Sequence, residues 1–156
     1  MPAHDEPGAA LYRQALLDHG RRPRNRGRLP CPPARLGEAR NRVCGDALTL
    51  YLELAGDRVA RARFEGQGCA ISQAAASLLT EALQGRARTE IAPLSELIRA
   101  LVTGEASANG PVIRVDELGA LQELGELAVL SALAPHPARH PCALLVIDAL
   151  DAAMEA

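Results

Sequence analysis

Cysteines are the residues of this chain whose positions are best suited to chemistry. Cys44 stands in "RVCGDAL", where Gly45 lets the backbone turn so that the thiol and the carboxylate of Asp46 can face one point. Cys69 stands in "GQGCAIS", a glycine-rich turn before a helical pattern, where the helix dipole and unpaired N–H groups favour a thiolate. Cys142, in "ARHPCALLVIDAL", also opens a helical pattern. All three thiols are therefore expected at the ends of secondary-structure elements.

Three sulfurs and one carboxylate form a donor set suited to tetrahedral Zn²⁺ or to iron in a cluster, provided that these element ends converge. The sequence contains no Cys-x-x-Cys pair, so the spacing alone leaves open that the cysteines are small residues packed near turns. Cys31 lies among prolines in "LPCPP" and is not expected to be a ligand. His140, two residues before Cys142, is the histidine nearest the expected site, and the pattern favours an exposed loop imidazole there.

Alternating and helical patterns predict the elements that must position these residues. A short edge strand is expected over 34–41, and a hairpin over 47–56 and 58–66. Helical periodicity covers 8–20, 71–84, 93–102, 118–133 and 142–154. Because most helices follow the strands, we expect an α+β domain in which a small antiparallel sheet of three strands carries helices on one face.

Composition limits the function further. The 156 residues carry a formal net charge of -2 and include two tyrosines, one phenylalanine and no tryptophan, which argues against a nucleic-acid reader. Neither a membrane span nor a secretory signal is recognisable, so a cytoplasmic protein with reduced thiols is expected. We predict a disordered tail over 1–10 and one domain over 11–156 with an irregular insertion around 103–119.

A basic stretch, "RRPRNRGRLP", follows the first helical pattern. Its arginines stand at positions 21, 22, 24, 26 and 28. One interpretation is a solvated loop, and the other is a docking patch for an acidic partner, because so many guanidinium groups create a strong local field.

Four motifs resemble, in order, the IscU/SufU family of iron–sulfur cluster assembly proteins, also called NifU-like N-terminal domains. They are "LYRQALLDHGRRPRNRG", "CGDALTLYLEL", "FEGQGCAISQAAASLLTEAL" and "RHPCALLVIDAL". The resemblance implies the family's α+β fold and metal ligands at Cys44, Asp46, Cys69 and Cys142. It also implies a pyridoxal-phosphate-dependent cysteine desulfurase, SufS-like, as sulfur donor, and downstream iron–sulfur assembly or recipient proteins as partners.

Departures from the IscU pattern favour the SufU branch. Pro141 stands where IscU proteins have a histidine, the irregular stretch resembles a SufU insertion, and Arg139 matches an arginine typical of SufU. The resemblance thus implies a zinc-dependent sulfur relay, a possible sulfurtransferase, with Cys44 as persulfide acceptor and Arg139 in support. The alternatives are a non-catalytic scaffold that assembles and transfers a [2Fe-2S] cluster, and an interaction module whose cysteines are incidental.

Overall fold

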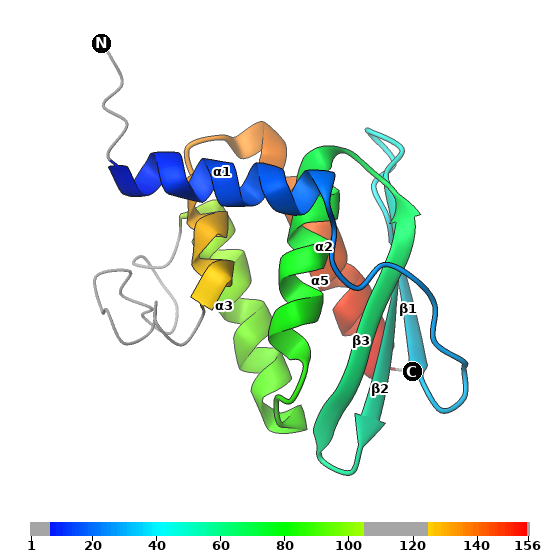
Figure 1. Ribbon diagram of the computed structural model, residues 1–156. Helices are drawn as coiled ribbons and strands as arrows, with labels where there is room; N and C mark the ends of the chain where they lie inside the picture. Colours follow the sequence, from blue (N-terminus) through cyan, green and yellow to red (C-terminus); the bar gives the residue numbers. More distant parts are fainter. Residues whose placement is uncertain (1–6, 105–124, 156) are drawn as a thin grey trace.

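The computed structural model describes residues 7–104 and 125–155, which form one sheet and a set of helices (Figure 1). The long elements are α1 (Pro7–Arg21), β1 (Arg35–Arg40), β2 (Ala47–Ala55), β3 (Arg58–Gln67), α2 (Ala70–Leu83), α3 (Ile91–Thr103) and α5 (His140–Glu155). Short 3₁₀ helices are η1 (Arg88–Glu90), η2 (Gly125–Leu133) and η3 (Pro137–Arg139).

The sheet has three strands in the order β1-β2-β3, and both pairings are antiparallel. Alternation along β2 buries Leu48, Leu50 and Leu52 in the main core, as the sequence pattern predicts. Tyr51 points to the other face, where it packs with residues of the segment before β1 in a second, small cluster. The predicted α+β fold is confirmed, with the helices gathered on one side of the sheet (Figure 1).

Helix α2 is the centre of the helical layer. It is buried along most of its length and packs against α1, α5 and β3. Helix α5 covers β1 and β2. At Gly37 on β1 the backbones approach so closely that a Cβ atom would lie 2.0 Å from the carbonyl oxygen of Ala149 and 2.4 Å from the backbone nitrogen of Ala153. Glycine is required here because no side chain fits between β1 and α5.

Two differences from the sequence prediction concern helix type and bounds. The segment expected to be a helix over 118–133 is described only from residue 125, where it forms the 3₁₀ helix η2. Four consecutive residues of η2, Leu127 to Leu130, are buried, so the segment has no polar face from which a helical period could be read. Helix α1 begins at Pro7, within the predicted tail. Residues 1–6 and most of the predicted insertion, 105–119, lie outside the described residues.

No helix within residues 7–104 and 125–155 combines the length and the apolar character that crossing a membrane requires.

Candidate metal centre

The predicted ligands come from three segments that meet at one end of the molecule, namely the β1–β2 loop and the starts of α2 and α5 (Figure 1). The β1–β2 loop is closed at its base, where the N–H of Asn41 donates to the carbonyl of Asp46 at 2.8 Å. The N–H of Gly45 donates to the carbonyl of Asn41, also at 2.8 Å. Gly45 has φ 79° and open space around its missing Cβ. Glycine is therefore favoured here by the left-handed backbone conformation and not by lack of space for a side chain. This turn presents Cys44 at the surface.

Cys44, Asp46 and Cys142 are brought together by this arrangement. One ligand atom from each lies within 4.8 Å of the other two. Sulfur ligands around a tetrahedral zinc ion are about 3.8 Å apart, as follows from a Zn–S bond of about 2.3 Å. The separations in this group are thus within about 1 Å of those around a tetrahedral zinc ion. The observed donor set fits a borderline-soft ion such as Zn²⁺ or iron.

Asp46 is held in place by the first turn of α2. Its Oδ2 atom accepts hydrogen bonds from the Ser72 hydroxyl at 2.7 Å and from the Cys69 backbone N–H at 3.3 Å, and neither bond uses Oδ1. Burial alone would raise the pKa of Asp46. The bonds from Ser72 and from the Cys69 backbone, assisted by the thiols of Cys44 and Cys69, outweigh burial and hold this pKa below its usual value. The carboxylate is therefore charged and oriented before any metal arrives.

Cys69 and Cys142 face each other at the starts of α2 and α5. Burial raises the pKa of Cys142 to about 12, and a hydrogen bond with Cys69 and the negative charges of Cys69, Cys44 and Asp46 act in the same direction. Cys69 interacts with Cys142 and Asp46 but is not in the group whose donor atoms all lie within 4.8 Å of one another. A bound cation would attract each thiolate and the Asp46 carboxylate and so offset the repulsion between these negative groups. It would thereby favour the deprotonated form of each thiol.

Other predicted residues lie beside this cluster. His140 is half-buried, and its Nε2–H donates to the backbone carbonyls of Leu133 at 2.9 Å and Ala134 at 3.2 Å. Its side chain thus joins α5 to the end of η2 and is half-buried rather than in an exposed loop. Arg139 is exposed and lines a depression of about 230 Å³ next to Ile71 of α2. Cys31 is exposed, and its Sγ contacts the carbonyl of Leu29 at 3.5 Å.

Two functional side chains were missed by sequence reasoning. Ser72 was not recognised as the residue that orients Asp46, although its position three residues after Cys69 places it in the same helical turn. His19 is buried and joins three elements, because its ring contacts the Ser77 hydroxyl of α2 at 2.8 Å and the Glu126 carboxylate of η2. Sequence alone could not show this, since Glu126 is far from His19 along the chain.

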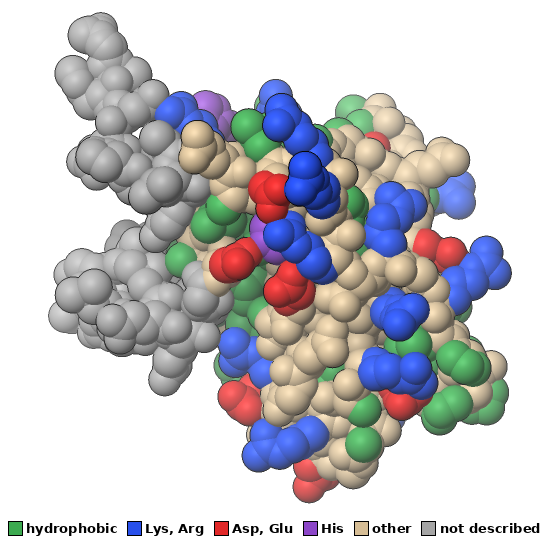
Figure 2. Space-filling view, viewed as in Figure 1, with side chains coloured by type: hydrophobic (Ala, Val, Ile, Leu, Met, Phe, Trp, Pro, Cys, Tyr) green, Lys and Arg blue, Asp and Glu red, His purple; other side chains and the backbone are tan. Residues whose placement is uncertain are grey.

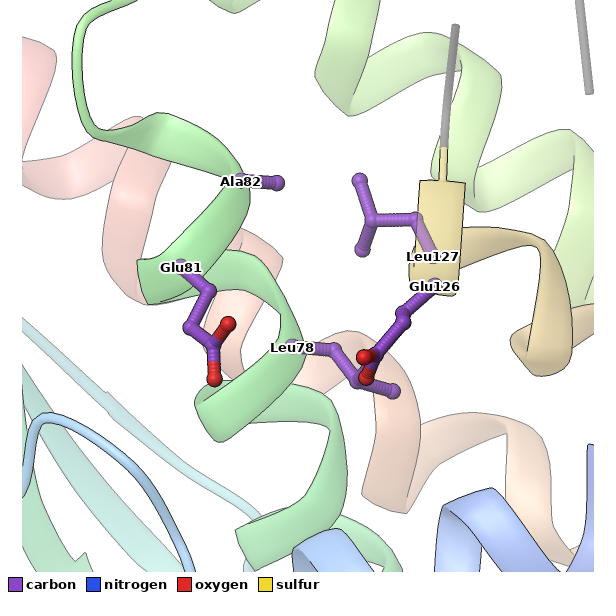
Figure 3. A pocket seen from close by; sticks show the side chains of 5 residues that line it. All are labelled: Leu78, Glu81, Ala82, Glu126 and Leu127. Carbon is purple, nitrogen blue, oxygen red and sulfur yellow. The ribbon is translucent and has the colours of Figure 1, made fainter. Parts of the chain in front are cut away.

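A second depression, of about 170 Å³, lies between α2 and η2 (Figure 3). Glu81 and Glu126 line it together with apolar side chains, and neither carboxylate is unpaired. Glu81 contacts Arg24 at 3.5 Å, and Glu126 contacts His19. The contacts of both carboxylates therefore tie α2 and η2 to α1 and the loop that follows it.

Fold and site together define a small α+β protein with a thiol-rich candidate metal centre at one end of its sheet. The model of the NifU-like N-terminal domain matches residues 11–143, and the chain belongs to this family. This confirms the resemblance seen in the four sequence motifs.

Relatives of known name fall into both branches of the family. The chain is 34% identical to the zinc-dependent sulfurtransferase SufU of Bacillus subtilis, over 90% of this chain and 87% of that protein. It is 33% identical to the iron–sulfur cluster assembly scaffold protein IscU of Thermotoga maritima, over 93% of both. A crystal structure of an iron–sulfur cluster assembly scaffold protein for the SUF system from Fervidobacterium islandicum superposes with a TM-score of 0.75 at 25% identity, covering 90% of this chain and 94% of that one.

Proposed function

We propose that this chain is a zinc-dependent sulfur acceptor that takes sulfur from a pyridoxal-phosphate-dependent cysteine desulfurase of the SufS type in the cytoplasm. It would pass the sulfur to iron–sulfur assembly or recipient proteins. One observation supports the proposal most: an exposed cysteine on a glycine-containing loop lies within 4.8 Å of a second thiol and an oriented carboxylate. Similarity to the sulfurtransferase SufU adds support.

Cys44, Asp46, Cys69 and Cys142 would hold the zinc ion, which supplies positive charge that keeps the thiols deprotonated at neutral pH. In the transfer step, the Cys44 thiolate attacks the terminal sulfur of the donor's persulfide. A sulfur–sulfur bond forms at Cys44, the sulfur–sulfur bond of the donor breaks, and the donor cysteine leaves as a thiolate. Cys44 is the best acceptor because its loop can move, whereas Cys69 and Cys142 are anchored at helix starts.

Asp46 and Arg139 would assist this step in different ways. A hard carboxylate oxygen competes poorly with thiolates for zinc, so Asp46 would be the weakest ligand and would hold the geometry that lets Cys44 exchange between the metal and the incoming sulfur. Its hydrogen bonds to Ser72 and Cys69 keep the carboxylate in place meanwhile. Arg139 is exposed close to the start of α5, where its charge would favour the negative sulfur during transfer.

A scaffold that carries a [2Fe-2S] cluster is the second candidate. The same donor set suits iron in a cluster, and the similarity to IscU proteins favours this function. On such a scaffold the cluster is cargo, and no desulfurase needs to be accelerated.

Alanine production by the partner desulfurase distinguishes the two functions. We expect the zinc-loaded wild type to increase this rate and Cys44→Ala to abolish the increase while the protein remains folded. Cys31→Ser is the matched control, because Cys31 is also exposed but lies outside the cluster. Equal stimulation by wild type and Cys44→Ala would exclude Cys44 as acceptor. Brown, iron-containing protein without stimulation would support the scaffold.

A further inference from the structure

The arginine-rich loop that follows α1 is fixed against the sheet. The N–H of Gly27 donates to the carbonyl of Phe64 at 2.8 Å, and the N–H of Phe64 donates to the carbonyl of Asn25 at 3.0 Å. Asn25 adopts φ 64°, a conformation that asparagine tolerates better than most residues. The loop thus runs along β3 like a very short additional strand, and its side chains have defined positions.

Part of the positive charge of this loop is neutralised locally. Arg24 pairs with Asp18 at 2.8 Å and with Glu81 at 3.5 Å. Arg28 pairs with Glu65 at 2.9 Å. These pairs tie the loop to α1, α2 and β3, and they account for the acidic side chains nearest to it.

Three arginines at the end of α1 and in the loop, together with one on β3, form what we call the basic face. They are Arg21, Arg22, Arg26 and Arg63. Arg26 lies over the Phe64 ring at 5.9 Å and donates to Gln73 at 3.0 Å, so its position is fixed without loss of charge. The other three are exposed and form no ion pair within residues 7–104 and 125–155. Figure 2 shows basic side chains gathered over the end of α1, the loop and β3.

The basic face lies beside the candidate metal centre. Helix α1 touches the start of α2 so closely that a Cβ on Gly20 would lie 2.8 Å from the carbonyl oxygen of Ala70. Arg21 directly follows Gly20, and Cys69 directly precedes Ala70, so a guanidinium and a predicted ligand flank one backbone contact. The basic face therefore begins beside the start of α2, next to one of the predicted ligands.

We infer that the basic face is the docking surface for the protein that donates sulfur to Cys44, and that the donor presents an acidic patch to it. This inference rests on the proposed function. The charge is local, since the whole chain has a formal net charge of -2, and a local concentration of one sign is suited to orienting a protein partner. A nucleic acid is disfavoured because the basic face offers no exposed aromatic ring for stacking, Phe64 being fully buried.

Charge reversal tests the inference. The variants are Arg21→Glu/Arg22→Glu on α1 and its loop and Arg63→Glu on β3, each loaded with zinc. The matched control is Arg88→Glu, an equally exposed arginine just after the far end of α2. Alanine production by the cysteine desulfurase of the same organism is measured against the concentration of each variant, at low salt and at about 1 M salt, where the Debye length is about 3 Å.

At low salt we expect the double variant to raise the half-saturating concentration about tenfold, because rim charges contribute modestly to affinity and each reversal replaces attraction with repulsion. Arg63→Glu should act in the same direction. High salt should remove the difference, and zinc content and maximal rate should match wild type throughout. Using two variants on separate elements ensures that misfolding of one does not decide the result.

Three outcomes would overturn the inference. An unchanged half-saturating concentration in the double variant and in Arg63→Glu, equal to that of Arg88→Glu, overturns the docking surface but leaves the proposed function intact. Arginine-dependent binding of a transfer-RNA-sized RNA, with desulfurase stimulation unaffected, identifies a nucleic-acid surface instead. A wild-type protein that neither binds nor stimulates the desulfurase overturns the proposed function, and the inference with it.

Discussion

Replacing Ser72 with alanine removes the hydrogen bond that contributes most to keeping Asp46 charged. The Ser72 hydroxyl is fully buried and donates to the Asp46 carboxylate at 2.7 Å. A hydrogen bond to a charged group contributes about 1.5–3 kcal/mol, and in a chain of this length each kcal/mol shifts the melting temperature by about 2–4 °C. We therefore expect Ser72→Ala to lower the melting temperature of the metal-free protein by several degrees.

Ser95→Ala is the matched control. It makes the same chemical change at another buried helical position, but the Ser95 hydroxyl has no hydrogen-bond partner among the described residues. Removing an unpaired buried hydroxyl should cost little or even stabilise the fold. The melting temperatures of both variants and of the wild type are measured by thermal unfolding of chelator-treated, reduced protein at neutral pH. The reasoning is refuted if Ser72→Ala loses no more stability than Ser95→Ala.

The effect of Ser72→Ala should depend on pH. Because the pKa of Asp46 is depressed in the folded state, the charged carboxylate contributes stability above the unfolded-state pKa of the carboxyl group. That contribution is lost as the pH falls through the lower, folded-state pKa. The difference between wild type and Ser72→Ala should therefore be largest near neutral pH and should shrink in acid, where Asp46 becomes protonated in both proteins.

Further predictions concern metal and ligands. Chelation should lower the melting temperature of the zinc-loaded protein in a thermal scan, because clustered thiolates and a carboxylate repel one another without a cation, and an unchanged curve after metal removal would contradict this. Cys31→Ser should retain zinc in elemental analysis, whereas Cys69→Ser should lose much of it; equal losses would mean that the ligand set is wrong. His140→Ala should cost about 1 kcal/mol of stability by freeing the carbonyls of Leu133 and Ala134, yet keep its zinc, and loss of the metal would instead indicate ligation.

The elements could be predicted wherever a residue pattern has one buried and one exposed side. β2 places every second residue from Leu48 to Leu52 in the main core, and α3 has a clear apolar stripe, so the positions of these two elements follow from the sequence to within a few residues. Placing Cys44, Cys69 and Cys142 at element ends allowed a shared site only on the condition that these ends converge, and the family resemblance supplied the ligand set; the structure brings Cys44, Asp46 and Cys142 together. The helix type of η2 could not be predicted in this way. The segment is buried on several sides, so its hydrophobic pattern has no period that would distinguish an α-helix from a 3₁₀ helix.

Contacts between distant segments could not be predicted from one sequence. The bond from Ser72 to Asp46 and the pairing of His19 with Glu126 arise only when α1, α2 and η2 pack together. His140 illustrates the difficulty well, since the sequence pattern favoured an exposed loop imidazole, whereas the side chain is half-buried. Its Nε2–H is instead used by two backbone carbonyls, because the chain turns back just before α5.

The close contact of Gly37 with α5 has a consequence for reading genetic screens. Cys142 lies at the start of α5, about 10 Å along the helix axis from the point where Ala149 meets Gly37. Any side chain at position 37 must push this helix away from the sheet, and the displacement is carried along a rigid rod to the thiol. We therefore expect a side chain at position 37 to weaken metal binding, although residue 37 is not itself a predicted ligand. Loss of function in a variant at position 37 would therefore indicate a displaced α5 helix, which carries Cys142, rather than a missing contact between residue 37 and the metal.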